Sequence, residues 1–291
     1  MKKIAFIGLG VMGYHMASHL IKKNYFVNII RRNSKNTKAF IKKFYNTGKL
    51  NVYSELQELA INSNVIISCV GNDKDLNDIF FSTKGIIKGV KEKTIIIDHT
   101  TASVDISLLL SKSFEEKKCF FYDAPISGGE QGAINGTLSI MVGGNKKYFK
   151  ILQNTLDTYS KSLIYMGRSG NGQLTKMVNQ ICVASVIQGL SEGINLAIVK
   201  KLNIEKLINV IKNGAGQSWQ LENRALTMSK DQFNFGFMNK LMLKDLNLIL
   251  EEIKGDNVKL PVTKEIRKYY KKLVNSGNEK LDTSSLIKLL K

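Results

Sequence analysis

Short apolar runs of strand length alternate with helical patterns through the first half of the chain. The runs are rich in Ile, Val and Phe and end at turn residues, as buried strands do. They cover residues 2–7, 26–30, 65–70, 94–98, 119–124, 138–143 and 163–166. One intervening helix is expected to open at Ser54, with Gln57 as its capping-box partner. Strands that alternate with helices predict an α/β fold with a mostly parallel sheet.

The pattern changes near residue 170, where long helical periodicities replace the strand-like runs. Residues 172–200 contain no proline and keep an apolar stripe, so they predict one helix of about 40 Å. Gly189, Gly193 and Ala197 recur every four residues along it. This spacing favours close approach of another helix, either from the same domain or from a second subunit. We expect a sheet domain over 1–166 and an all-helical domain over 167–291.

A glycine motif joins the first strand-like run to the first helical pattern. It reads Gly8-Leu9-Gly10-Val11-Met12-Gly13. In the dinucleotide fingerprint the first glycine allows a tight turn, the second lets the backbone approach a pyrophosphate, and the third lets helix and strand pack closely. The phosphates then lie at a helix N-terminus. The sequence therefore predicts a dinucleotide site, with a purely structural glycine-rich turn as the alternative.

The second strand-like run ends without a carboxylate. An acidic residue there holds the ribose 2′-hydroxyl of NAD, whereas an arginine accommodates the 2′-phosphate of NADP. Here the chain continues Arg31-Arg32-Asn33-Ser34. Because guanidinium groups bind phosphate through two parallel hydrogen bonds, the sequence favours NADP(H) over NAD(H). A solvated basic turn is the alternative.

Two later segments carry groups suited to the reacting end of a cofactor and to a small anion. Ligands in open α/β sheets bind beyond the carboxyl ends of the strands. Residues 98–101, Asp-His-Thr-Thr, supply hydroxyl groups at one such end. Residues 123–129, Asp-Ala-Pro-Ile-Ser-Gly-Gly, supply the Ser127 hydroxyl and glycines that expose backbone N–H groups to an anion. An irregular glycine-rich turn is the alternative for the second segment.

Three polar residues share one side of the long helix. Lys176, Asn179 and Gln180 are spaced i, i+3 and i+4, beside apolar neighbours. Facing a cofactor, Lys176 could give a proton to a carbonyl oxygen while hydride reaches the carbon, and Asn179 could hold the substrate. A lysine in this role needs a pKa lowered by partial burial or nearby positive charge. A solvated face is the alternative.

Composition narrows the remaining classes of protein. Three scattered cysteines without a C-x-x-C pair and three histidines without ligand spacing argue against a disulfide framework or a metal site. No apolar run approaches about 18 residues and no cleavage-like site follows the N-terminal lysines, so we expect a cytoplasmic chain without a membrane segment. The net charge of +19 comes from lysines spread along the chain, which disfavours nucleic acid and favours anionic cofactors and carboxylate substrates.

Four motifs together resemble those of the β-hydroxyacid dehydrogenases. This group contains 3-hydroxyisobutyrate dehydrogenase, 2-hydroxy-3-oxopropionate (tartronate semialdehyde) reductase and the glyoxylate and succinic semialdehyde reductases. The motifs are GLGVMGYHMASHL (8–20), DAPISGGEQGAINGTLSIMVGG (123–144), GNGQLTKMVNQ (170–180) and KDLNLILEE (244–252). Their order and spacing match the family nearly from end to end. The resemblance implies a Rossmann-type domain, a helical C-terminal domain and an active site between them.

The resemblance also implies roles for single residues. Lys176 matches the family's catalytic lysine. The positions that match substrate-binding residues are Ser127, Gly128, Gly129 and Asn179. Besides the glycine motif, the positions assigned to the cofactor are Arg32, Asn33, Ser34, Val70, Gly71, Thr101 and Lys244.

The chain departs from the family pattern at two cofactor positions. Arg31-Arg32-Asn33 stands where NADP-using members commonly carry Asn-Arg-Thr, so similar but not identical phosphate contacts are expected. Gly71 replaces a usual proline, which is expected to loosen that loop. Neither change touches Lys176, whose presence disfavours the imine-reducing relatives. The length of 291 residues disfavours a typical 6-phosphogluconate dehydrogenase.

These features predict an oxidoreductase that transfers hydride between NADP(H) and a small β-hydroxy acid or semialdehyde acid. Lys176 is expected to be the general acid or base, and no metal is expected. The alternatives are an imine or larger sugar-acid reductase on the same fold, and a non-catalytic protein that binds through its basic surface. Because dimers and tetramers are common among such relatives, we also expect a homo-oligomer.

Overall fold

The structure is a computed structural model that describes residues 3–291; the first residue of the first expected strand, Lys2, lies outside the described residues. The chain divides into two compact units, one up to Lys176 and one from Met177 to Lys291. The boundary falls inside the long helix α8 (Asn171–Val199). The functional division expected at residues 166 and 167 stays a prediction.

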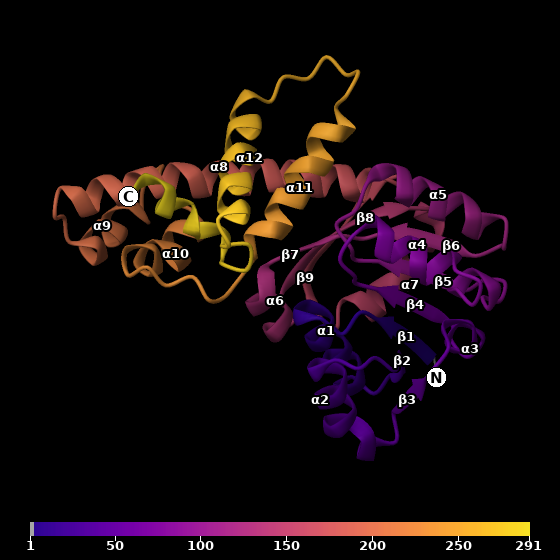
Figure 1. The fold of residues 1–291 in the computed structure, drawn as a ribbon. Coiled ribbons are helices and arrows are strands. Elements are labelled where there is room, and N and C mark those ends of the chain that lie inside the picture. The colour runs from indigo at the N-terminus through magenta and orange to yellow at the C-terminus, as the bar shows by residue number, and fades with distance from the viewer. Residues whose placement is uncertain (1–2) are drawn as a thin grey trace. The chain divides into compact units, whose positions relative to one another are not determined.

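The first unit is built on a mostly parallel sheet (Figure 1). Its strand order is β3-β2-β1-β4-β5-β6-β8-β7, and β9 pairs with β8. The strands are β1 (Lys3–Ile7), β2 (Phe26–Ile30), β3 (Leu50–Tyr53), β4 (Val65–Ser68), β5 (Ile95–Asp98), β6 (Phe120–Asp123), β7 (Ile126–Ser127), β8 (Leu138–Gly144) and β9 (Ser160–Gly167). The order reverses between β1 and β4, and ligands in such sheets bind beyond the carboxyl ends of the strands at this reversal. The expected fold class is confirmed.

Helices cover both faces of this sheet because its central strands are apolar on both sides. Ile4 and Phe6 of β1 pack in one core with α1 (Val11–Lys22), α2 (Lys35–Phe44) and α7 (Lys146–Leu156). Ala5 and Ile7 pack in the other core with α3 (Leu56–Ile61), α4 (Asp73–Phe81) and α5 (Val104–Glu115). Short elements complete the unit: α6 (Gly129–Asn135), η1 (Tyr45–Thr47) and η2 (Ile86–Lys88).

The structure corrects two details of the sequence prediction. The helix expected to open at Ser54 begins after Glu55, which has no side-chain cap hydrogen bond. The expected capping box is therefore wrong: the Glu55 carboxylate instead pairs with Lys84, and the Gln57 amide lies 3.5 Å from the carbonyl oxygen of Lys88. The strands β3 and β7 were not predicted, because β3 is only half-buried and β7 has two residues.

The second unit is all-helical, as expected. Besides most of α8 it contains α9 (Ile204–Ile211), α10 (Trp219–Ser229), α11 (Asn239–Glu252), α12 (Pro261–Asn275) and η3 (Thr283–Leu290). Its core includes Ile194 of α8, Met228 of α10 and Ile287 of η3.

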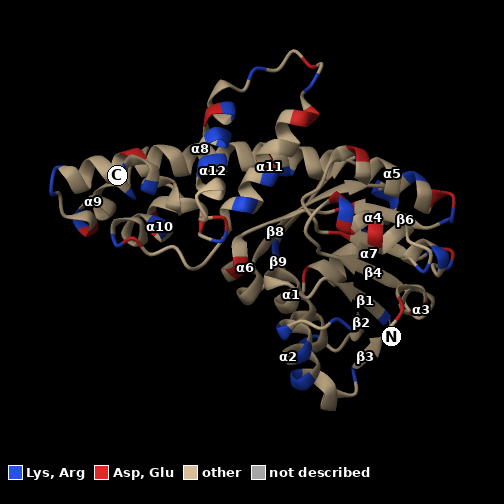
Figure 2. Cartoon of the chain, in the orientation of Figure 1, with Lys and Arg blue, Asp and Glu red and all other residues tan. Residues whose placement is uncertain are grey.

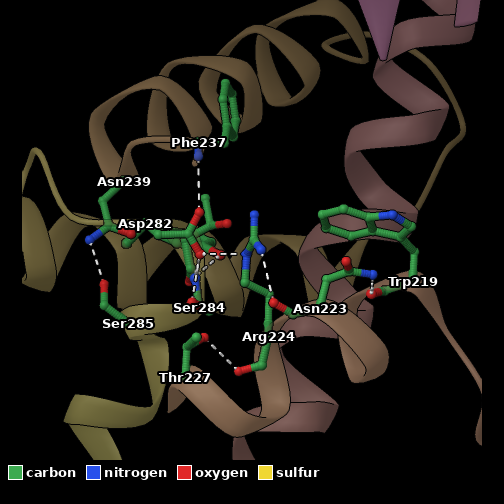
Figure 3. Close-up of polar contacts among 11 residues, drawn as sticks. Trp219, Asn223, Arg224, Thr227, Phe237, Asn239, Asp282, Ser284 and Ser285 are labelled. Carbon is green, nitrogen blue, oxygen red and sulfur yellow. Dashed lines mark hydrogen bonds and ion pairs between the residues drawn. The ribbon is translucent and has the colours of Figure 1, made fainter. Parts of the chain in front are cut away.

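A buried aspartate organises the end of this second unit (Figure 3). The Asp282 carboxylate accepts hydrogen bonds from the backbone N–H groups of Phe237 and Ser284, at 2.9 and 3.0 Å, and pairs with Nε of Arg224 at 3.2 Å. The Arg224 guanidinium also lies over the rings of Trp219 and Phe235, with 4.9 and 4.8 Å to the ring centres. These contacts join α10 to η3 and to the segment that leads into α11.

The helix α8 is exposed over much of its length. Among residues 3–291 it is the one helix long and apolar enough to cross a membrane, with 28% of its most apolar 18-residue window buried. The sequence expectation considered only uninterrupted apolar runs and therefore did not find it. Length and composition are weak evidence for a span, since long helices inside folded domains have the same properties. A side chain at Gly189 or Gly193 would meet no described atom within 4 Å, so the close approach of a helix from the same domain, expected as one alternative, is not present at these glycines.

Candidate active site

The glycine motif forms the turn between β1 and α1, as expected. Gly8 has a φ of +99°, and a Cβ there would lie 2.1 Å from the carbonyl oxygen of Cys69. A Cβ at Gly13 would lie 1.9 Å from the carbonyl oxygen of Gly8. At Gly10, the N-cap of α1, a Cβ would meet no described atom within 4 Å, and no side chain caps the helix there. Gly8 and Gly13 thus serve close backbone packing, while Gly10 leaves an open helix N-terminus that suits a pyrophosphate.

The loops after β4 and β5 are tied together beside this turn. The N–H of Val70 donates to Oγ1 of Thr100 at 3.1 Å, and Oγ1 of Thr100 donates to Oδ1 of Asp98 at 2.7 Å. The N–H of Gly71 donates to the Asp75 carboxylate at 2.9 Å. A proline at position 71 has no N–H and could not make this last bond. Gly71 therefore restrains the loop after β4 rather than loosening it, which corrects the expectation from the sequence.

Two buried carboxyl groups end the neighbouring strands β5 and β6. Asp98 and Asp123 are paired in register and have no exposed surface. Burial raises the pKa of Asp98 to about 7 and that of Asp123 to about 6. Among the described residues, Oδ2 of Asp98 has no hydrogen-bond partner, while Oδ1 accepts bonds from Ser68 and Thr100.

His99 is a structural residue rather than an acid or base. Burial lowers the pKa of His99 to about 4, so the ring is neutral at physiological pH. Its Nδ1 lies 2.6 Å from the carbonyl oxygen of Ala124 and its Nε2 lies 2.9 Å from the Tyr159 hydroxyl. These partners favour the tautomer with the proton on Nδ1, because a carbonyl oxygen can only accept.

Asp123 fixes the start of α8. Its carboxylate accepts the backbone N–H groups of Gly170 at 2.8 Å and Gln173 at 3.0 Å. A Cβ at Gly172 would lie 2.4 Å from the carbonyl oxygen of Asp123, so only glycine allows this approach. Lys176 follows on the next turn and is 7% exposed. The expected lysine is therefore buried on a helix whose first turn is held at the carboxyl edge of the sheet.

The expected substrate loop lies at the start of α6. Ser127 ends β7, which pairs antiparallel with β8, and Gly128 is the N-cap of α6. His19 of α1 has Nε2 3.0 Å from the carbonyl oxygens of both Ala133 and Ile134. The structure thus joins the fingerprint helix to the helix that the substrate loop opens.

The residues expected at the 2′-phosphate follow β2. Arg32, Asn33 and Ser34 are all exposed. Ser34 caps α2: its Oγ accepts the N–H of Thr37 at 3.1 Å and donates to Oγ1 of Thr37 at 2.8 Å. The Ser34 proton is thus already used within the chain, which leaves Arg32 and Asn33 as the better phosphate donors of the three.

In the second unit, Asn179 and Lys244 belong to one network. Nδ2 of Asn179 donates to Oε1 of Gln180 at 2.8 Å, and Nε2 of Gln180 donates to Oδ2 of Asp245 at 2.6 Å. Nζ of Lys244 lies 3.3 Å from Oδ1 of Asp245. The structure therefore links an expected substrate residue of α8 to an expected cofactor residue of α11.

Sequence reasoning missed two residues of these networks, Gln173 and Asp245. The sequence places both beside residues already expected at the site: Gln173 lies three residues before Lys176, and Asp245 follows Lys244. Within residues 3–291, no group of three or more His, Cys, Asp and Glu side chains is placed to hold a metal ion.

Comparison with known proteins identifies the family. Residues 3–167 match the NAD-binding domain family of 6-phosphogluconate dehydrogenase, and residues 170–290 match the family described as the NAD-binding region of NADP-dependent 3-hydroxyisobutyrate dehydrogenase. The chain belongs to the 3-hydroxyisobutyrate dehydrogenase family. It is therefore an NAD(P)-dependent oxidoreductase of the β-hydroxyacid dehydrogenase type, which confirms the resemblance of its motifs.

Relatives match over nearly the whole chain. An uncharacterized oxidoreductase of Shewanella frigidimarina is 40% identical over 99% of this chain and 97% of its own length. The mitochondrial 3-hydroxyisobutyrate dehydrogenase of Drosophila melanogaster is 30% identical over 100% of this chain and 90% of its own length. Family membership thus rests on both units.

Solved structures show the same fold. The Mycobacterium tuberculosis 3-hydroxyisobutyrate dehydrogenase solved with L-serine has a TM-score of 0.87 at 24% identity, covering 100% of this chain and 99% of that one. Psf3 in complex with NADP+ and 2-OPP has a TM-score of 0.90 at 18% identity, covering 99% of this chain and 100% of that one.

Replacing Asp98 by Asn tests the buried carboxyl group. Because the folded-state pKa of about 7 lies above the ordinary value of 3.8, the folded chain binds this proton more tightly than the unfolded chain. The stability that this contributes is present below the ordinary pKa and is lost as pH rises through about 7. Asn keeps an acceptor oxygen and cannot ionise. We expect the melting temperature of Asp98→Asn, minus that of the wild type, to increase from about pH 5 to about pH 8.

The exposed Asp105 of α5 provides the control. The same difference for Asp105→Asn should stay flat over this range. A flat difference for Asp98→Asn as well would show that Asp98 is ionised in the folded chain throughout.

Proposed function

We propose that this protein transfers hydride between NADP(H) and a small β-hydroxy acid or its semialdehyde, with Lys176 as general acid and base. The observation that carries the proposal is Lys176 itself. It is a buried lysine, 7% exposed, on a helix whose first turn Asp123 holds at the carboxyl edge of a dinucleotide-binding sheet. Family membership alone does not decide that this chain has kept a catalytic group; the buried lysine supports that it has.

The residues of the first unit fit a dinucleotide. The uncapped N-terminus of α1 and the open space at Gly10 suit the pyrophosphate. The loop after β4, with Val70 and Gly71, and the loop after β5, with Thr101, suit the nicotinamide end. Bound NADPH supplies hydride from C4 of its nicotinamide. Lys176 then holds the proton that the carbonyl oxygen takes on reduction, and it removes the hydroxyl proton in the reverse direction. His99 is not placed for this role, since its ring is buried and both of its nitrogens have partners within the first unit.

The substrate is proposed to carry a primary alcohol beside a carboxylate-bearing carbon. Three proteins similar to this chain support this: the Drosophila 3-hydroxyisobutyrate dehydrogenase, the 2-(hydroxymethyl)glutarate dehydrogenase of Eubacterium barkeri, and the mycobacterial enzyme solved with L-serine. All three named compounds contain a hydroxymethyl group on the carbon next to the carboxylate. Ser127, the N–H groups of Gly128 and Gly129, and Asn179 are the proposed partners of the carboxylate and oxygen substituents, and Lys244 is a proposed cofactor contact.

Replacing Lys176 by Ala tests the proposed chemistry. The purified protein is incubated with NADPH or NADH and a panel of small semialdehyde acids and glyoxylate, and the loss of reduced-nicotinamide absorbance is followed. We expect the wild type to turn over substrate and Lys176→Ala to be at least about 1,000-fold slower, because the variant has lost the group that donates and accepts the proton. The dissociation constant for NADPH, from its fluorescence, should change less than about 3-fold.

An equal loss of turnover and cofactor affinity would contradict the role of Lys176. Good NADPH binding without turnover across the panel would instead favour a larger sugar acid, an imine, or a family member that no longer catalyses. Lysine and arginine lie on helices of both units (Figure 2), so a salt titration of DNA binding tests the non-catalytic alternative: only phosphate contacts give a steep salt dependence.

Replacing Arg32 by Ala tests the choice of NADP(H). A charge-assisted hydrogen bond contributes about 1.5–3 kcal/mol, so loss of the guanidinium should weaken NADPH binding about 10- to 100-fold. NADH lacks the 2′-phosphate, and its dissociation constant should change less than about 2-fold. Lys35→Ala, at the exposed start of α2, is the control for general loss of positive charge. A similar effect of Arg32→Ala on both cofactors would contradict the phosphate role.

We also propose that the exposed seam of α8 packs against a second copy of the chain. Val186, Gly189, Gly193 and Leu196 are spaced three and four residues apart, as in a helix–helix seam, and all four are exposed. The open space at the two glycines would let a partner helix approach closely, as the sequence suggested. Family membership favours a partner subunit over a membrane, and the cytoplasmic location expected from the sequence stays a prediction.

Leu196→Asp tests this assembly. Leu196 is 59% exposed, so the substitution should leave the fold of the single chain intact. In a subunit interface the aspartate would be buried, which would strongly destabilise the assembly. We expect light scattering after size-exclusion chromatography to give a dimer or larger species for the wild type and about half that mass or less for the variant. Leu109→Asp, at a leucine of α5 that is 48% exposed, should keep the wild-type mass. A wild-type monomer would contradict the proposal.

A further inference from the structure

The side chain of Gln173 holds the backbone on both sides of Thr101. Its Oε1 accepts the N–H of Ala102 at 3.1 Å, and its Nε2 donates to the carbonyl oxygen of Thr100 at 2.7 Å. These two peptide groups flank Thr101. One carboxamide therefore fixes the loop after β5 at the residue expected to meet the cofactor.

The orientation of this carboxamide is determined by its partners. The Ala102 N–H can only donate and the Thr100 carbonyl can only accept, so exchanging the oxygen and nitrogen of Gln173 would break both bonds. Gln173 has no exposed surface, so water cannot replace either partner. Loss of the carboxamide would leave a buried donor and a buried acceptor unsatisfied.

The same residue is anchored through its backbone. The N–H of Gln173 donates to Oδ2 of Asp123 at 3.0 Å, which fixes it to the end of β6. Lys176 lies three residues further along α8 and therefore on the same side of the helix. Gln173 thus connects the end of β6, the loop of Thr101 and the helical turn that bears Lys176.

We propose that Gln173 is a positioning residue that sets Lys176 relative to the Thr101 loop. This inference rests on the proposed function, in which the loop meets the nicotinamide end of the cofactor and Lys176 moves the proton. Hydride and proton must reach the two ends of one carbonyl group, so the two donors need a fixed separation. A misplacement of about 1 Å in such a pair costs about 100-fold in rate.

Gln173→Met removes the two hydrogen bonds while keeping a side chain of similar length. We expect kcat to fall about 10- to 100-fold, with less than about a 3-fold change in KM for the acid substrate. The kinetic isotope effect with C4-deuterated reduced cofactor should increase, because hydride transfer becomes more fully rate-limiting. Ser191→Ala is the matched control: it removes a buried 2.8 Å hydrogen bond in the same helix, and its kcat should stay within about 2-fold of the wild type.

Gln173→Glu gives a pH signature that a merely structural role would not. The protonated carboxyl group can donate to the Thr100 oxygen and accept from the Ala102 N–H, whereas the ionised form repels that oxygen. Burial favours the protonated form. We expect kcat of this variant relative to the wild type to increase as pH falls, and the ratio for Gln173→Met to stay flat.

Hydrogen exchange separates this inference from the proposed function. In the apo protein, the Ala102 amide should exchange faster in Gln173→Met than in the wild type, and at the wild-type rate in Ser191→Ala. Unchanged exchange, or a kcat for Gln173→Met equal to that of the control, would overturn the positioning role. Faster exchange in Gln173→Met, together with a wild type that turns over no substrate, would support the contact and reject the proposed function.

Discussion

The candidate site depends on one buried carboxylate, that of Asp123. It ends β6 and accepts two backbone N–H groups from the first turn of α8, so the longest helix begins at a fixed point on the sheet. Unpaired N–H groups at the start of a helix attract negative charge, so they favour the ionised form of the Asp123 carboxyl group, whereas burial disfavours it. Burial nevertheless dominates and raises the pKa of Asp123 to about 6. The position of Lys176 follows from this contact, since it lies on the next turn of the helix.

A second carboxyl group, that of Asp98, organises the loops after β4 and β5. Asp98 stands beside Asp123 in the sheet register and binds the hydroxyl groups of Ser68 and Thr100. Thr100 in turn accepts the Val70 N–H. The two aspartates thus each organise one set of loops at the carboxyl edge. Burial also keeps His99 neutral. Asp98, His99 and Asp123, at the ends of β5 and β6, thus have structural roles, and Lys176 is the candidate for proton transfer.

In the second unit, too, a buried carboxylate accepts several hydrogen bonds, and here it joins helices to one another. The Asp282 carboxylate joins α10, η3 and the segment before α11 (Figure 3). The Arg224 guanidinium beside it lies over the rings of Trp219 and Phe235. The helix α11 then carries Lys244 and Asp245 into the network with Gln180. A buried acidic residue with several donors specifies one arrangement of segments far apart in sequence, since an unsatisfied carboxylate would be costly.

Features that depend on neighbouring residues could be predicted from the amino-acid sequence. The glycine motif, the alternation of strands and helices, and the lysine on the long helix were all evident, because backbone geometry and periodicity act over a few residues. Local pattern failed where another partner competed, as at Ser54 and Gln57, whose expected cap is absent. The contacts of Gln173 and Asp98 became evident in the folded chain, because the partners of Gln173 lie 71 and 73 residues away and Ser68, a partner of Asp98, lies 30 residues away. Hydrogen bonds of this kind depend on which strand ends meet at one edge of the sheet, and strand order is set by packing of the whole unit.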